Sequence, residues 1–156
     1  MLSRNPDWYE SLSGFQAEGA WMVGDWQCVQ ESGQRSTPNP PPEITVARVL
    51  LAIRDGNPEG VSNAFSIARA QLGAPIRATG RNSYRRTYES VLNLHMVRDV
   101  ELIYEAIIAR QSEYRDNPNT IGVLSEVLSR RSEATLPSFR SREPVLSLQR
   151  TALGVR

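Results

Sequence analysis

The chain has 156 residues, enough for one domain with a buried core or for a few structural repeats. Its 18 basic residues, all arginine, balance 17 acidic ones at a formal net charge of +1, which argues against a nucleic-acid partner. One cysteine and one histidine exclude an internal disulfide and a Cys/His zinc site, and the absence of a long apolar run predicts a soluble intracellular protein with no membrane partner.

The first predicted element is a helical hairpin over residues 8–32. Gly24 is placed to end the first helix in a left-handed conformation, and Asp25 to cap the second. Trp21 and Trp26 could line a ligand pocket, but packing between the two helices is the preferred interpretation. Large apolar residues at helical spacing are interpreted as one face of the first helix: Trp8, Leu12, Phe15, Trp21 and Met22.

A second helical hairpin is predicted over residues 43–72, after the proline-rich loop 32–42. Gly56 is the expected stop of its first helix, Asn57 the N-cap and Pro58 the first residue of its second helix. Small alanines in the second helix would let a neighbouring helix approach closely. Its apolar stripe comprises Val61, Ala64, Phe65, Ala68 and Leu72.

The C-terminal half is predicted to begin with a long helix over residues 82–110, because no glycine or proline interrupts it. A break of this helix near Arg98 is the alternative. Turn residues at 116–120 lead into a shorter helix over 121–133, and a last helix over 144–154 is expected to begin at its proline.

The fold class predicted from these elements is all-α. No segment shows the alternating pattern of a strand, and helices joined by short turns favour an α-solenoid of stacked antiparallel hairpins, similar to tetratricopeptide repeats. The apolar C-terminal stretch lacks a polar capping turn, which indicates that residues 1–156 are a fragment of a longer helical repeat domain.

No residue is predicted to be catalytic, to bind a cofactor or to hold a metal. The glycines are scattered, and neither a His-Arg-Asp nor an Asp-Phe-Gly string occurs. His95 could act as a general base, but its place on an apolar stripe favours a hydrogen-bonded histidine between helices. Cys28 has no flanking cation, so a buried, unreactive thiol is preferred to a reactive one.

One arginine-rich stretch could form a nucleic-acid surface. Arg81, Arg85 and Arg86 lie among two tyrosines, an arrangement that can stack on single-stranded RNA or DNA. Glu89 interrupts the cluster, so a solvated helix face is the preferred interpretation.

Three stretches together resemble the FAT region of ATR-type checkpoint kinases, which are phosphatidylinositol-3-kinase-related protein kinases. Residues 18–26 resemble its helix, turn and tryptophan pattern, and residues 82–96 its long helix with a leucine-histidine-methionine step. Residues 131–150 resemble its serine, aromatic, arginine, Glu-Pro and leucine-rich string. The loops at 38–42 and 111–122 depart from the family pattern, and loop length varies at little cost.

The resemblance implies a nuclear serine/threonine kinase that signals DNA damage and stalled replication, with this segment as a scaffold around the kinase domain. Its partners would be the kinase domain and neighbouring repeats of the same parent chain, with protein regulators and a dimer partner in addition. The parent kinase would use ATP and Mg²⁺, whereas this chain has no cofactor. A free-standing repeat module that binds a peptide is the alternative, and an arginine-rich nucleic-acid binder ranks last.

Overall fold

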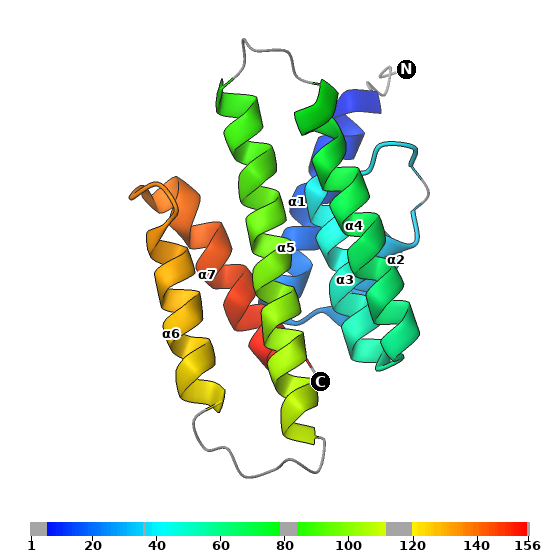
Figure 1. Cartoon of the computed structure of the whole chain (residues 1–156). Helices are drawn as coiled ribbons and strands as arrows, with labels where there is room; N and C mark the ends of the chain where they lie inside the picture. Colours follow the sequence, from blue (N-terminus) through cyan, green and yellow to red (C-terminus); the bar gives the residue numbers. More distant parts are fainter. Residues whose placement is uncertain (1–5, 36, 79–83, 112–119, 156) are drawn as a thin grey trace.

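The computed structural model describes residues 6–35, 37–78, 84–111 and 120–155 (Figure 1). Within these ranges all regular structure is helical and no strand occurs, so the all-α prediction is confirmed. The helices are α1 (Pro6–Val23), α2 (Trp26–Gly33), α3 (Pro42–Asp55), α4 (Pro58–Ala78), α5 (Tyr84–Gln111), α6 (Thr120–Glu133) and α7 (Phe139–Gly154).

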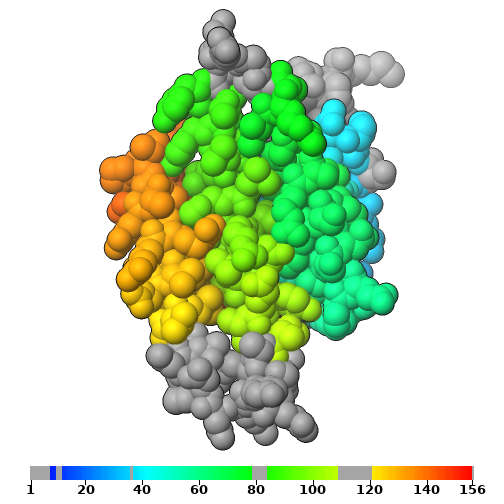
Figure 2. All heavy atoms as spheres, in the orientation of Figure 1, coloured from blue at the N-terminus to red at the C-terminus, as the bar shows by residue number. Residues whose placement is uncertain are grey.

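Helix α5 lies in the middle of the molecule and contacts α3, α4, α6 and α7 (Figure 1). From α1 to α5 each helix packs on its neighbour in the chain or on the next helix but one: α1 on α2 and α3, α2 on α3, α3 on α4, and α4 on α5. Helices α6 and α7 cover the other side of α5, and α7 returns to contact α1. The side chains of α4, α5 and α6 make up much of the surface seen in Figure 2. The extension of this packing into a solenoid stays a prediction.

One continuous hydrophobic core runs through the packed helices. Leu50, Phe65 and Ile103 are among its large buried side chains, and each contributes about 1.5–3 kcal/mol on burial. Leu128 joins the core from α6, and Leu148 joins it from α7. The two halves of the chain therefore share one core.

Two glycines form the tight turns of the predicted hairpins. Gly24 and Gly56 have φ angles of 79° and 72°, in the left-handed region that penalises side chains with a Cβ. Asp25 accepts a hydrogen bond from the Cys28 amide at 3.1 Å. The Asn57 side chain accepts one from the Glu59 amide at 3.2 Å, and α4 begins at the following proline, as predicted.

Substituting Gly56 by alanine is expected to lower the free energy of unfolding by about 1–2 kcal/mol, because alanine must adopt a left-handed conformation there. Gly73 is the matched control, since it lies inside α4 with no atom within 4 Å of an added Cβ. Gly73→Ala should stabilise the chain by about 0.5–1 kcal/mol. Urea denaturation of both variants measures the difference, and equal effects would contradict the assignment of the turn.

The five large apolar residues predicted to share one face of α1 lie on two different faces. Trp21 is buried, but the other four large residues of the proposed face are exposed to solvent. The inward face of α1 instead carries Gly14, Ala17 and Ala20 beside Trp21. A Cβ on Gly14 would come within 3.2 Å of the Pro41 side chain, so the small residues allow the chain near α3 to approach closely.

Two helix boundaries also differ from those predicted, the start of α7 and the end of α4. Helix α7 begins at Phe139, five residues before Pro144, because the Ser138 side chain caps it by accepting from the Ser141 amide at 3.3 Å. Pro144 lies in the second turn, where it removes only one intrahelical hydrogen bond. Helix α4 likewise continues past residue 72 and through Pro75. Helix α5 is continuous at Arg98, as the preferred prediction of one long helix had it. The predicted turn at 116–119 and the start at 82–83 lie outside the described residues.

Candidate functional site

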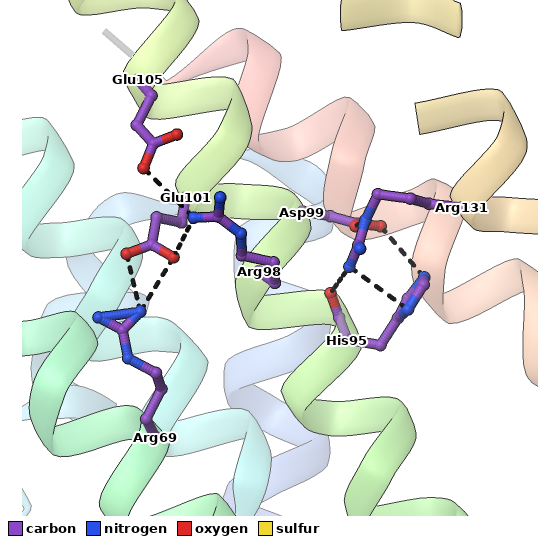
Figure 3. Close-up of polar contacts among 7 residues, drawn as sticks. All are labelled: Arg69, His95, Arg98, Asp99, Glu101, Glu105 and Arg131. Atoms are coloured by element: carbon purple, nitrogen blue, oxygen red, sulfur yellow. Dashed lines mark hydrogen bonds and ion pairs between the residues drawn. The ribbon is translucent and has the colours of Figure 1, made fainter. Parts of the chain in front are cut away.

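The most buried polar contacts join α5, α6 and α7 around Asp99. Its side chain is 1% exposed, and both of its carboxylate oxygens accept hydrogen bonds from other helices. Arg131 of α6 donates through Nε to Oδ1, and Gln149 of α7 donates through Nε2 to Oδ2 at 2.8 Å. We call Asp99, Arg131, Gln149 and His95 the polar junction (Figure 3 shows all but Gln149).

His95 completes the polar junction one helical turn before Asp99. Arg131 Nη2 lies 3.3 Å from His95 Nδ1 and donates to the His95 carbonyl oxygen at 3.2 Å. The other ring nitrogen, Nε2, is 3.7 Å from Asp99 Oδ2 and makes no hydrogen bond. His95 therefore lies between helices, as expected, and contributes to their packing.

Burial lowers the pKa of His95 below its ordinary 6.5, and the charge of Arg131 lowers it further, against the opposing charge of Asp99. The unfolded chain consequently binds more protons between the folded-state pKa and 6.5. Stability due to His95 is complete above pH 6.5 and falls as the solution is acidified through this window.

We expect His95→Gln to flatten the loss of melting temperature between pH 7 and about pH 5, because it removes this proton uptake. Glu18 has the opposite sign: burial first, then Glu43 and Glu143, raise its pKa above 4.5, so its contribution favours the folded state as pH falls. The melting temperature of the His95→Gln variant is therefore compared with that of the unsubstituted chain at each pH. Identical pH profiles would contradict the role assigned to His95.

A second ionic network joins α4 to α5 at the surface (Figure 3). Glu101 accepts both hydrogen bonds of Arg69 Nη1, at 2.8 and 2.9 Å, and one from Arg98 Nη1 at 2.6 Å. Arg98 also reaches Glu105 at 3.2 Å. Glu101 is only 14% exposed, whereas Arg69, Arg98 and Glu105 are 51%, 46% and 54% exposed. Ion pairs with such exposed partners contribute about 0–1 kcal/mol each. The network links α4 to α5.

The hairpin residues Cys28 and Trp26 are only partly buried. The Cys28 thiol is less enclosed than predicted, because α2 is short and buries few side chains. Gln16 Nε2 donates to its sulfur at 3.6 Å. The Arg54 guanidinium carbon lies 5.2 Å from the centre of the Trp26 ring, a cation–π contact at the surface.

The arginines and tyrosines considered as a nucleic-acid surface are divided in the structure. Arg85 and Arg86 are exposed, and Arg85 lies 3.6 Å from Glu89, whereas Arg81 is outside the described residues. Tyr88 is half-buried, and its hydroxyl accepts the Leu136 amide hydrogen bond at 3.0 Å. This tyrosine therefore anchors the segment between α6 and α7.

Sequence reasoning missed the partners of Asp99. The available signal was Asp99 itself, a carboxylate four residues after His95 on an apolar stripe. In the part of the chain that the structure describes, no group of three or more His, Cys, Asp or Glu side chains could hold a metal ion. No described helix has the length and apolarity needed to cross a membrane.

The shared core and the polar junction define an all-helical packing module whose polar side chains join helices to one another. The chain belongs to the FAT domain family, whose model matches residues 13–156. This finding confirms the resemblance seen in the sequence.

Curated relatives of the chain are plant kinases. It is 27% identical over 168 residues to the serine/threonine-protein kinase ATR of Arabidopsis thaliana, covering 99% of this chain and 6% of that protein. It is 26% identical over 152 residues to the ATR kinase of Oryza sativa subsp. indica, covering 89% of this chain and 6% of the relative. No solved structure matches the chain.

Proposed function

We propose that this chain is a non-catalytic helical scaffold segment of an ATR-like serine/threonine kinase that acts in nuclear DNA-damage and replication-stress checkpoint signalling. The FAT family match over residues 13–156 carries the proposal. The two ATR kinases named above support it, since nearly the whole chain is similar to about 6% of their length. The kinase domain and neighbouring repeats of the parent polypeptide are the partners, and ATP and Mg²⁺ are bound by the parent outside this segment.

The scaffold acts by favouring one arrangement of its helices over another. Helix α5 contacts α4 through the surface ionic network and contacts α6 and α7 through the polar junction. A displacement of one group of helices is thereby transmitted through α5 to the other group. Packed elements of this kind influence a distant active site only by favouring one of two arrangements.

The test uses the natural polypeptide that contains this chain. We expect the purified parent to phosphorylate serine or threonine in protein substrates with ATP and Mg²⁺, and the tagged parent to enter the nucleus. Cells in which Asp99→Ala is introduced into the parent should lose checkpoint arrest under replication stress, whereas Glu105→Ala should leave it intact. A parent without a kinase domain would contradict the proposal and favour the free-standing repeat module.

A further inference from the structure

The outward face of α1 carries a continuous apolar stripe, which we call the outer stripe: Trp8, Leu12, Phe15, Gly19 and Met22. Its four large side chains are 73%, 63%, 67% and 47% exposed in chain order. The spacing along the chain is four, three, four and three residues, the repeat that places side chains on one seam facing another helix.

Helix α1 is therefore apolar on two opposite sides. Ala17, Ala20 and Trp21 face the core, where α2, α3 and α7 contact the helix. A solvent-facing helix normally carries polar residues opposite its buried face, whereas a helix that is apolar on both sides belongs between two layers. The outer stripe has the composition of a buried face.

Gly19 adds a separate geometric indication. It lies in the middle of the outer stripe, and no atom lies within 4 Å of a Cβ built on it. A glycine inside a helix costs about 0.5–1 kcal/mol relative to alanine, so the position has a disadvantage in the isolated chain. The same missing side chain would allow the backbone of a crossing helix to approach α1 closely between Phe15 and Met22.

We propose that the outer stripe binds an apolar helix of the parent kinase polypeptide that precedes this segment in sequence. The inference rests on the proposed function. Between α1 and α5, packing follows chain order, so the neighbour expected on the open side of α1 is the helical hairpin before it. The matched region is only 6% of the relatives' length, so those proteins have much further chain outside it.

Photo-crosslinking in the full parent polypeptide tests this directly. Phe15 is replaced by benzoylphenylalanine, and the crosslinked peptide is identified by mass spectrometry. The matched control is the same replacement at Tyr84, which is 81% exposed at the start of α5. We expect Phe15 to crosslink to a helix preceding residue 1 within the same polypeptide.

A crosslink from Phe15 to a second copy, to another protein or to water only would overturn the inference. Oxidative footprinting gives an independent measurement: Met22 should be oxidised about tenfold more slowly in the parent than in the 156-residue chain, as for a group reached only by local opening. Equal rates would overturn it as well. A parent that phosphorylates its substrates but leaves the stripe open contradicts only this inference, whereas a parent without a kinase domain contradicts the proposed function.

The substitution pair Leu12→Asn and Phe15→Asn separates docking from folding. In the isolated chain both positions are exposed, so the melting temperature should change by no more than about a degree or two. In the parent polypeptide the same two substitutions should remove the protection of Met22 from oxidation and lower the melting temperature of the FAT region. Equal, small effects in both proteins would show that no helix covers the stripe.

Discussion

Asp99→Ala is expected to lower the free energy of unfolding by about 3–5 kcal/mol, as for breaking a buried ion pair by removing one partner. The carboxylate is 1% exposed and accepts hydrogen bonds from α6 and α7. Its removal leaves the Arg131 charge partly buried without a counterion and leaves the Gln149 amide unpaired. Both groups then bear the desolvation cost of burial without a compensating hydrogen bond.

Glu105→Ala is the matched control, because Glu105 is also a carboxylate on α5 paired with an arginine but is 54% exposed. Its removal should cost less than about 1 kcal/mol. Guanidinium denaturation followed by circular dichroism compares the two variants. A loss below about 1 kcal/mol for Asp99→Ala would show that α6 is not held to α5 by this carboxylate.

A double substitution distinguishes an attractive pair from a simple packing defect. Asp99→Leu with Arg131→Met removes the charge together with its counterion, so it should be less destabilising than the sum of the two single changes. The coupling energy should be about 1–3 kcal/mol. Additive effects would mean that Asp99 and Arg131 do not interact in solution.

Local chemistry made part of this fold predictable from the sequence. Gly56, Asn57 and Pro58 marked a helix boundary because glycine favours a helix C-terminal cap, asparagine an N-cap and proline the first helical residue, and Gly24 with Asp25 did the same for the first hairpin. These signals depend on residues adjacent in the chain. They therefore need no knowledge of tertiary contacts.

Features that depend on distant contacts were not predictable in the same way. Helix α1 has two apolar faces, so periodicity alone could not tell which one is buried. The start of α7 was misplaced because a proline is a stronger sequence signal than the N-cap at Ser138. Asp99 meets Arg131 across 32 positions and Gln149 across 50, and no local pattern encodes either pairing.

The three tryptophans of the chain are expected to contribute unequally to stability. Trp21 is 4% exposed within the core, so Trp21→Ala should lower the free energy of unfolding by about 3–5 kcal/mol through lost burial and a residual cavity. Trp26 is half-buried under the Arg54 guanidinium, and its truncation should cost about 1–2 kcal/mol. The two tryptophans of the hairpin therefore contribute unequally, although the sequence suggested equal roles.

Trp8→Ala is the matched control, since it removes the same side chain from the outer stripe of the same helix. In the isolated chain we expect a change within about 0.5 kcal/mol. Domains of this size have a free energy of unfolding of about 5–15 kcal/mol. Only the Trp21 variant should therefore lose a large share of its stability. Thermal and urea melts of the three variants give the order directly, and a larger loss for Trp8 than for Trp21 would mean that α1 packs through its other face, with the outer stripe inside the core.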